Sequence, residues 1–484
     1  MTTEESPLLG ASDPTVLEHE AVYRRFSSTH KIWIVALVSF CGLIPLFVSG
    51  SFIPSIPEIA KDLDSTGEVV SLAVSLSVLT SAFGCLLWAT YSSFYGRKPI
   101  YVLSLLFQVA GSLGVSQSRT VAELLTLRVL QAFGSSSGLS IGIAVIGDIY
   151  RLEERGTASG IFFGCVLLGP ALAPVAGGFA AQYYSWRLMQ LALAVAGVAT
   201  LVFVIVFLPE TSHPGVRGVD KVEEGKTKWV WLNPLKSLTL LRSPNVLLVA
   251  LAGGITLLVD YSLLVPIAYT MGARYNIDNA AIIGALFIPS GLGNLLGAPI
   301  AGKLSDMVVV RMRAQRGGVW VPEDRLRVTL IGASLMIPLS ILGSGIFITY
   351  VDGTPGIVLN LICLFVNGLG VCTRLFDPLH MGATHACFIS QVDFVLSPSA
   401  AYGVDILHSR SAEVSAATMA LRGVIIAACT STILPLINTL GVLTTYTIAA
   451  VIGWIGFGFL WSVVHYGGRM RAYVDVGYST ARDN

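Results

Sequence analysis

The chain has 484 residues, of which 54% are hydrophobic and only 12% are Asp, Glu, Lys or Arg. A soluble chain of this length would have about three domains and about 25% charged residues, so the apolar excess indicates contact with lipid. Thirty basic residues against 29 acidic ones leave a net charge of +1, which gives no basic field to hold nucleic acid. The composition argues against a cytosolic enzyme, a disulfide-stapled secreted domain and a disordered protein, and it indicates a membrane protein.

Twelve stretches are apolar enough to span a membrane, which takes about 20 mostly apolar residues per helix. Most turns between them are short, but the polar and basic segment 209–245 follows the sixth span and divides the chain into two sets of six. The sequence therefore predicts an all-α membrane protein of two six-helix bundles, as in transporters built from two halves. The predicted spans are 33–53, 69–89, 99–117, 122–147, 157–181, 188–208, 246–270, 280–302, 328–350, 356–370 (continuing at 392–404), 413–438 and 443–465.

The positions of Lys and Arg predict the orientation of the chain in the membrane. If the N-terminus is cytoplasmic, most basic residues fall in inner segments, and the outer turns carry only Lys61, Arg119, Arg187 and Arg274. Both termini are therefore predicted to be cytoplasmic. The predicted order is a tail at 1–32, a bundle at 33–208, a linker at 209–245, a bundle at 246–465 and a tail at 466–484.

The polar first thirty residues show no cleavable signal peptide. They contain EESPLL (Glu4 to Leu9), which resembles an acidic di-leucine sorting signal, although an ordinary cytoplasmic tail explains the segment as well. The predicted location is the cell membrane, with a vacuolar or endosomal membrane as the alternative.

The polar residues give no sign of an enzyme or of a metal site. Seven cysteines have no paired spacing, and seven histidines form no ligand cluster. The run Gly297 to Leu304 (GAPIAGKL) has Leu304 where a phosphate-binding loop needs Ser or Thr, and Gly291 to Gly297 (GLGNLLG) lacks the dinucleotide-binding spacing. We expect no enzymatic activity, no cofactor and no metal.

The turn between the second and third spans reads WATYSSFYGRKPIY (Trp88 to Tyr101). It resembles the cytoplasmic-loop signature of the major facilitator superfamily, in particular of its fungal drug:proton antiporters. The resemblance implies a cytoplasmic gate formed by Ser93, Gly96 and Arg97, with Asp148 at the end of the fourth span. The acidic residue of the signature is replaced here by Ser93, which offers only a neutral hydrogen bond, so the gate is weaker or another acid supplies the charge.

The resemblance extends over nearly the whole chain. RVLQAFGSSSG (Arg128 to Gly138) is similar to the family's fourth-span motif, which includes Gln131. GKLSD (Gly302 to Asp306) repeats the loop signature in the second half and keeps its acid, Asp306, as a further gate residue. RGGVWVPEDRLR (Arg316 to Arg327) resembles a segment of fungal multidrug and spore-wall-precursor exporters.

The fifth span contains GPALAPVAGG, which is similar to the family's antiporter motif. Its glycines remove side-chain bulk and its prolines remove backbone N–H groups, so the helix can bend and a neighbouring helix can approach it closely. The resemblance implies a flexing gate, and a tight packing seam is the alternative. The residues concerned are Gly169, Pro170, Pro174, Gly177 and Gly178.

Three charged residues lie inside predicted spans, where each costs about 2.5–3.5 kcal/mol on insertion scales and is a functional candidate. Asp260, near the middle of the seventh span, is the candidate proton carrier. Arg128 is a fixed positive charge that can orient an anionic substrate or a nearby acid. Arg422, in the eleventh span, can also extend toward the inner surface. A structural buried pair is the alternative for each.

Residues 371–391 interrupt the tenth span with charged residues and histidines that cannot continue a lipid-facing helix. Family members resemble the flanking sequences joined directly. Because valine codons begin with GT and glutamine codons can end in AG, Val371 and Gln391 fit the borders of an intron. We interpret the segment as a retained intron, and a genuine substrate-binding loop is the alternative.

The resemblance implies a major facilitator that alternates access by rocking one half against the other. The predicted function is proton-coupled export of a small organic compound, either a drug or a secreted metabolite such as an organic acid or glycolipid. A non-transporting membrane sensor and a proton-coupled uptake symporter are the alternatives. The expected partners are the substrate, protons and the lipid bilayer, with no nucleic acid, and the protein is expected to work as a monomer.

Overall fold

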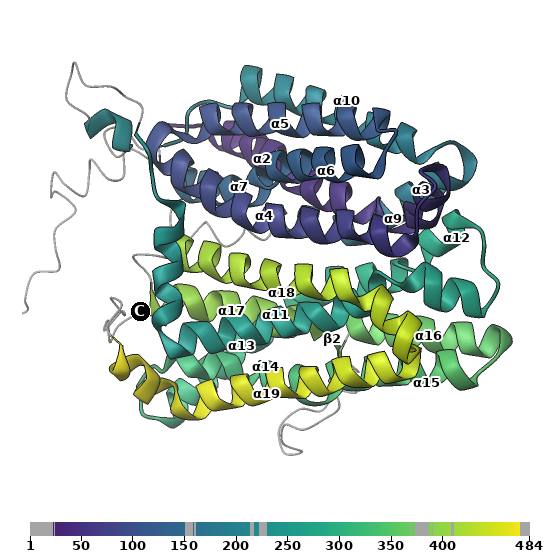
Figure 1. Cartoon of the computed structure of the whole chain (residues 1–484). Coiled ribbons are helices and arrows are strands. Elements are labelled where there is room, and N and C mark those ends of the chain that lie inside the picture. The colour runs from purple at the N-terminus through teal and green to yellow at the C-terminus, as the bar shows by residue number, and fades with distance from the viewer. Residues whose placement is uncertain are drawn as a thin grey trace, which may run out of the picture.

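The computed structural model describes residues 23, 25–150, 158, 161–212, 217–221, 230–368, 370–372, 387–389, 391–407 and 411–474. Its helices lie in two groups, which Figure 1 shows as an upper and a lower bundle. The upper bundle contains α2 (Ser28–Gly50), η1 (Ile53–Ser55), α3 (Ile56–Asp62), α4 (Gly67–Tyr95), α5 (Arg97–Gln117), α6 (Val121–Ser135), α7 (Ser137–Ile149), α9 (Leu168–Tyr183) and α10 (Trp186–Phe207).

The second half of the chain follows two short 3₁₀ segments, η2 (Gly218–Lys221) and η3 (Pro234–Arg242). Its elements are α11 (Pro244–Leu264), η4 (Ala268–Gly272), α12 (Ala280–Ala285), α13 (Ile288–Gln315), η5 (Pro322–Arg327), α14 (Thr329–Ile331), η6 (Gly332–Met336), α15 (Ile337–Tyr350), α16 (Gly353–Gly368), β1 (Gly370–Cys372), β2 (Cys387–Ile389), α17 (Gln391–Ile406), α18 (Ser411–Leu440) and α19 (Val442–Tyr473). The segments η4 and η6 are single π-helical turns.

The predicted all-α membrane fold is confirmed. Within the described residues, ten helices are long and apolar enough to cross a membrane. Two shorter apolar helices, Ala280–Leu295 and Gly353–Asn367, coincide with the predicted eighth and tenth spans. The outer and inner ends of the helices are named below according to the predicted orientation, and the inner end is on the left in Figure 1.

Several helices begin at outer turns where a polar side chain accepts a hydrogen bond from the first helical turn. Thr66 accepts from the backbone N–H of Val69, and Thr120 accepts from that of Glu123. Asn279 accepts from the first turn of α12 in the same way. Such N-caps satisfy backbone donors that a helix start would otherwise leave free, so short polar turns are enough to separate consecutive spans.

The hydrophobic core is shared by the two bundles at their outer ends. One cluster of buried residues joins Phe52, Val70 and Trp186 of the first half with Leu263 and Ile433 of the second. Toward the inner ends, two smaller clusters each belong to one half, around Tyr101 in the first and around Leu326 in the second. The structure is therefore closed between the halves on the outer side.

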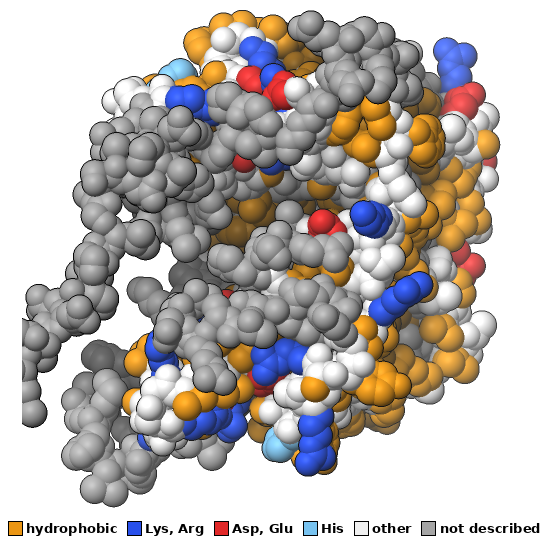
Figure 2. Space-filling view, turned by 90° about the vertical axis from the view of Figure 1, so that its left-hand side faces the viewer, with side chains coloured by type: hydrophobic (Ala, Val, Ile, Leu, Met, Phe, Trp, Pro, Cys, Tyr) orange, Lys and Arg blue, Asp and Glu red, His pale blue; other side chains and the backbone are white. Residues whose placement is uncertain are grey.

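Charged side chains are exposed at the inner end of the molecule. Figure 2 shows Lys and Arg side chains at this end, while hydrophobic side chains cover the adjoining face that lipid would contact. Within the predicted polar linker, η3 packs against both bundles. Leu240 is buried in the inner cluster of the second half, and Leu238 packs against Leu86 of α4 and Ala416 of α18.

A two-stranded antiparallel ribbon interrupts the tenth span. Strands β1 and β2 pair so that Gly370 lies opposite Ile389 and Cys372 lies opposite Cys387. The residues between the strands, and most of the predicted retained-intron segment, lie outside the described residues. The pairing brings the end of α16 and the start of α17 to one place.

The first turn of α5 is capped by a residue far away in the sequence. The carboxylate of Glu210 accepts hydrogen bonds from the backbone N–H groups of Arg97 (2.9 Å) and Lys98 (3.2 Å). Gly96 precedes the helix with a φ of +107°, and a Cβ on it would lie 2.5 Å from the Glu210 carboxylate. Only glycine fits both the conformation and the close approach.

We expect the protein to fold without residues 371–391, because the ribbon already joins their two ends. The deletion should leave the thermal unfolding temperature and the size-exclusion profile of the purified protein unchanged. Sequencing of the spliced transcript is the parallel test of the intron hypothesis. A mature transcript that retains these codons, together with a deletion that aggregates, would contradict it.

Substitution of Glu210 by Gln should lower the free energy of unfolding by about 1 kcal/mol, because a charged cap is replaced by a neutral one. Burial of this carboxylate would raise its pKa, but the hydrogen bonds from Arg97, Lys98 and Ser212 outweigh burial, so the pKa lies below its usual value. The contribution of Glu210 is therefore fully present above the ordinary carboxylate pKa of about 4.3 and is lost as the pH falls through the lowered value. Thermal unfolding at pH 7 and at pH 3 measures both effects. Equal stability of the variant and the wild type at pH 7 would show that the cap is dispensable.

Candidate functional site

A cavity of about 840 Å³ opens beside the inner half of α2. Its walls come from α2, including Lys31, Ser39 and Phe40, and from the start of the fifth span, including Ile161 and Cys165. Figure 2 shows the molecule hollowed between the two bundles at the inner end. The volume and the mostly apolar lining are typical of a site for a small organic molecule. The sequence analysis identified none of these residues as site residues, because an apolar helix face gives no local signal of a cavity.

Arg128 lies in the first half, and its side chain is fully buried. One guanidinium nitrogen, Nη1, donates to the carbonyl of Val48 (3.0 Å) and to Oε1 of Gln131 (2.8 Å). The guanidinium also stacks over the ring of Phe52, with its carbon 4.3 Å from the ring centre. Its Nε and Nη2 atoms have no hydrogen-bond partner among the described residues. Arg128 is thus a buried cation with two nitrogen atoms that have no hydrogen-bond partner among the described residues.

Gln131 connects Arg128 to a chain of buried polar side chains. Its amide nitrogen donates to Ser112 (2.8 Å) and to the Oε1 of Gln190 (2.9 Å). Gln108 donates to the same Ser112 hydroxyl at 3.0 Å. The network holds α5, α6 and α10 together and fixes the orientation of the Gln131 oxygen that faces Arg128. The two motif residues of the fourth span therefore form one unit.

Asp260 lies in the second half and is 6% exposed. Its Oδ1 accepts a hydrogen bond from the side-chain amide of Asn367 (2.7 Å), and Asn367 in turn accepts one from Ser340 (3.2 Å). The carboxylate is thus oriented by α16 and α15, and it lies in the opposite bundle from Arg128. Asn367 stands within NGLG, the sequence that ends α16, but the sequence analysis did not single it out.

The glycines of the fifth span face two different partners. A Cβ on Gly177 would lie 2.0 Å from the carbonyl oxygen of Ser51, and one on Gly169 would lie 2.5 Å from Leu46, both within the first bundle. A Cβ on Gly178 would instead lie 2.2 Å from the carbonyl oxygen of Ala280, in the second bundle. Gly177 and Gly169 thus allow packing within one half, whereas Gly178 allows the two halves to touch.

The second bundle approaches α9 with its own glycines. A Cβ on Gly284 would lie 2.4 Å from the carbonyl oxygen of Pro174, and one on Gly291 would lie 2.4 Å from the Cα of Ala171. Backbones of the two halves therefore meet along α9, α12 and α13 at the outer side. Pro170, which has no N–H to donate to the carbonyl of Val166, follows an interruption of the helix at Leu167. We call this crossing the outer seam.

The predicted gate residues around Arg97 lie together. Arg97 binds Asp148 through Nε (2.9 Å) and Nη2 (3.4 Å), and its Nη1 donates to Ser92 (3.0 Å) and Ser93 (3.4 Å). Ser93 thus contributes a neutral contact, while Asp148 and Glu210 place carboxylates on the same loop. Glu210 directly follows the sixth span, and this position was the signal that the sequence analysis missed.

The second half repeats this ion pair. Arg325, just before the ninth span, binds Asp405 at 2.8 Å, near the end of the tenth. Arg97 and Asp148 occupy the corresponding places before the third span and at the end of the fourth. The similar sequences IGDI and GVDI surround Asp148 and Asp405, so the repeat was visible in the sequence. The side chain of Asp306, the predicted gate residue of this half, lies outside the described residues.

Arg422 lies against α11. Its guanidinium covers Gly253, where a Cβ would lie 2.6 Å from Nε. Its Nε is buried and has no hydrogen-bond partner among the described residues. No group of three or more His, Cys, Asp or Glu side chains in the described part of the chain is placed to hold a metal ion.

Sequence comparisons agree with this architecture. Residues 38–386 match the family model described as Major Facilitator Superfamily. The chain is 27% identical to citrate exporter 1 of Aspergillus niger over 322 residues, which cover 61% of each chain. It is 33% identical to the MFS antiporter QDR3 of Candida albicans over 203 residues, or 42% of this chain and 29% of that one. The matched regions thus span less than two thirds of these relatives.

A solved structure shows the same fold. The bacterial homologue of the human lysosomal transporter Spinster, in an inward-facing and unoccupied conformation, superposes with a TM-score of 0.63 at 13% identity, over 94% of this chain and all of that one. The resemblance seen in the sequence is confirmed, as is the expectation of a transporter rather than an enzyme. With its two helical bundles and a family match over most of its length, the chain belongs to the Major Facilitator Superfamily, the multi-pass membrane transporters of small molecules.

Proposed function

We propose that this transporter exports a small organic compound from the cell in exchange for protons. The observation that carries the proposal is the outer seam, where Gly178, Gly284 and Gly291 let two separate bundles meet backbone to backbone. Such close contacts between helices of different bundles close the outer side, and they can open when the bundles rock. The relatives named as an exporter and as an antiporter support the direction and the coupling.

The cargo would enter from the cytoplasm through the cavity beside α2. Val48, whose carbonyl accepts from Arg128, lies five residues beyond the cavity residue Leu43, or about 7.5 Å along the helix. The free donors of Arg128 would attract an anionic group that reaches the outer end of the cavity. This argument favours an organic acid among the possible cargoes, and a drug or another secreted metabolite is the alternative.

Asp260 would carry the proton. It is buried in the second bundle and held by Asn367, on the other side of the transport path from Arg128. A carboxylate in a bundle interior is costly when charged, so its protonation can be coupled to the change between inward-facing and outward-facing states. Placing proton and cargo in opposite halves would make both sites depend on the same rocking movement.

A membrane sensor is a weaker explanation of the chain. That alternative rested on the missing acid at Ser93, but Asp148 and Glu210 bring two carboxylates to the same loop. An uptake symporter would use the same architecture in the opposite direction. We further propose that both termini are cytoplasmic, that the protein lies in the cell membrane and that it works as a monomer.

Deletion of the gene tests the function in cells. A metabolite profile inside and outside the cells should show at least one compound that accumulates inside the deletion strain and is depleted outside. Re-expression should restore the ratio. A sensor would change the amounts produced without changing the ratio, and an uptake symporter would shift the ratio the other way.

Substitution of Gly178 by Ala should prevent closure of the outer side. The new Cβ would meet the backbone oxygen of Ala280 in the other bundle, which no side-chain rotation can relieve. We expect export to fall at least about tenfold, with the protein still folded, because one clash of several kcal/mol shifts a two-state equilibrium that far. Export by cells measures the loss, and labelling of a cysteine introduced at the outer seam by an impermeant reagent measures the shift to the outward-open state.

Gly164 provides a matched control in the same span. A Cβ on Gly164 would meet no atom within 4 Å, so Gly164→Ala should export at the wild-type rate. Gly177→Ala should behave differently from both, because its clash lies within the first bundle and lowers stability. Export at the wild-type rate by Gly178→Ala would contradict the hypothesis that the outer seam is a gate.

Substitution of Asp260 by Asn should uncouple transport from protons. Asn keeps an oxygen that can accept from Asn367, but it cannot bind and release a proton at physiological pH. In reconstituted vesicles, export driven by a pH gradient should fall at least about tenfold, while exchange of labelled for unlabelled cargo without a gradient should continue. Ser344→Ala, in a separate buried network with Asn360, is the control. Undiminished pH-driven transport by Asp260→Asn would exclude this residue as the proton carrier.

A further inference from the structure

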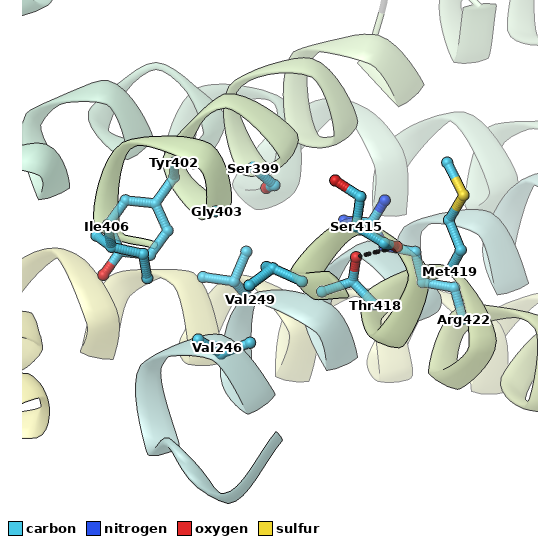
Figure 3. Close-up of a pocket in the computed structure, with 11 residues that line it drawn as sticks. Val246, Val249, Ser399, Tyr402, Gly403, Ile406, Ser415, Thr418, Met419 and Arg422 are labelled. Atoms are coloured by element: carbon cyan, nitrogen blue, oxygen red, sulfur yellow. Dashed lines mark hydrogen bonds between the residues drawn. The ribbon is translucent and has the colours of Figure 1, made fainter. Parts of the chain in front are cut away.

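A second, much smaller cavity lies in the inner half of the second bundle, among α11, α17 and α18. Its volume is about 50 Å³, and Figure 3 shows residues of all three helices around it. Valines 246 and 249 of α11 close one side, and α17 and α18 close the others. The space exceeds the roughly 10–15 Å³ that one water molecule needs and is far too small for a whole cargo molecule.

Two polar groups at this cavity have free hydrogen-bonding capacity. Ser399 of α17 is 3% exposed, and its hydroxyl has no hydrogen-bond partner among the described residues. The buried Nε of Arg422, on α18, also has none in the described part of the chain. Both groups can donate, and the guanidinium carries a full positive charge. The cavity therefore offers hydrogen-bond donors and a positive charge together.

Thr418 and Tyr402, two other polar residues of the wall, already have hydrogen-bond partners. The hydroxyl of Thr418 donates to the carbonyl of Ser415 (2.9 Å), a contact within α18 that Figure 3 draws as a dashed line. The hydroxyl of Tyr402 contacts Glu323 at 3.3 Å, and that carboxylate is paired with Arg471 at 3.1 Å. No Asp or Glu is among the residues that line the cavity. No described side chain that lines the cavity therefore neutralises the charge of Arg422.

The backbone of α11 makes room for the guanidinium at this position. Gly253 lies directly beneath it, and any Cβ there would come within 2.6–2.8 Å of its Nε, Nη2 and Cζ atoms. The guanidinium of Arg422 thus lies directly on the backbone of α11 at Gly253. A charged group that is fixed in a bundle interior is stable only when a counter-charge or strong hydrogen bonds compensate it.

We propose that this cavity binds one small monovalent anion, either chloride or a single carboxylate group, between Arg422 and Ser399. The guanidinium supplies the charge and the Ser399 hydroxyl supplies a second donor from the opposite helix. The anion joins α17 to α18 and neutralises Arg422. The carboxylate can come from a free acid or from one end of a cargo molecule. This site is separate from Arg128, which lies in the other bundle.

The test measures binding to the purified full-length protein in nanodiscs of neutral phosphatidylcholine. Thermal unfolding is followed in sodium p-toluenesulfonate, whose anion has no carboxylate and is too large for the cavity, and in sodium chloride or sodium acetate at equal ionic strength. Chloride or acetate should raise the unfolding temperature by about 1–2 °C at ten times the dissociation constant. Arg422→Gln should lose the shift, because the charge is gone.

Other variants retain the charge of Arg422, and they distinguish a loss of binding from a loss of folding. Gly253→Ala should raise the apparent dissociation constant of the anion at least about threefold, because the new methyl group displaces the guanidinium. Gly458→Ala on α19, where a Cβ meets nothing within 4 Å, should retain it. Ser399→Ala should also weaken binding, whereas Ser431→Ala, whose hydroxyl bonds within α18, should not.

The two anions distinguish the source of the ligand. A shift with both chloride and acetate supports a general small-anion site, and a shift with acetate alone supports a site for the carboxylate end of a cargo. Equal unfolding temperatures in p-toluenesulfonate, chloride and acetate would overturn the proposal. A shift that persists in both Arg422→Gln and Gly253→Ala would overturn it as well. Because binding is measured without transport, these results are independent of whether the protein exports anything.

Discussion

The architecture depends on how closely two helices from different bundles can approach each other. At the outer seam, Gly178 of α9 and Gly284 of α12 let the backbones of the two halves approach closely. In lipid there is little hydrophobic force between helices, so close van der Waals contact of this kind has to hold them together. The small residues at the outer seam therefore set how closely the two halves approach on the outer side.

The inner ends are stabilised in a different way, by charges at the membrane boundary. Each half has an arginine before one span and an aspartate at the end of the next, Arg97 with Asp148 and Arg325 with Asp405. All four side chains are partly exposed, and water and lipid headgroups at this depth lower the cost of keeping them charged. The linker adds a third element, since Leu238 of η3 packs between α4 and α18. The inner side is thus organised by ion pairs within each half and by one connecting segment.

Polar groups deeper in the bundles are satisfied to different degrees, and the differences indicate function. Asp260 is oriented by Asn367, and Gln131 is tied into a network of neutral side chains. Arg128 and Arg422 keep donors that the described residues do not use. A buried donor without a partner is rare in folded proteins because it costs free energy, so such groups mark places where a ligand or a counter-ion completes the structure.

The sequence by itself determined the membrane class and the all-α fold, because apolar length is a local property. It also predicted twelve spans, an interrupted tenth span and an arginine with an aspartate at the gate, and the described residues contain ten long apolar helices and two shorter ones. It also placed the glycines of the fifth span at a close contact. Only the tertiary structure decided that Gly177 packs within its own bundle while Gly178 faces the other, and that Glu210 caps a helix more than a hundred residues earlier. These facts depend on how each helix is rotated about its axis and which helices cross. Rotation and crossing are set by the packing of all the spans together, and no single stretch of sequence encodes them.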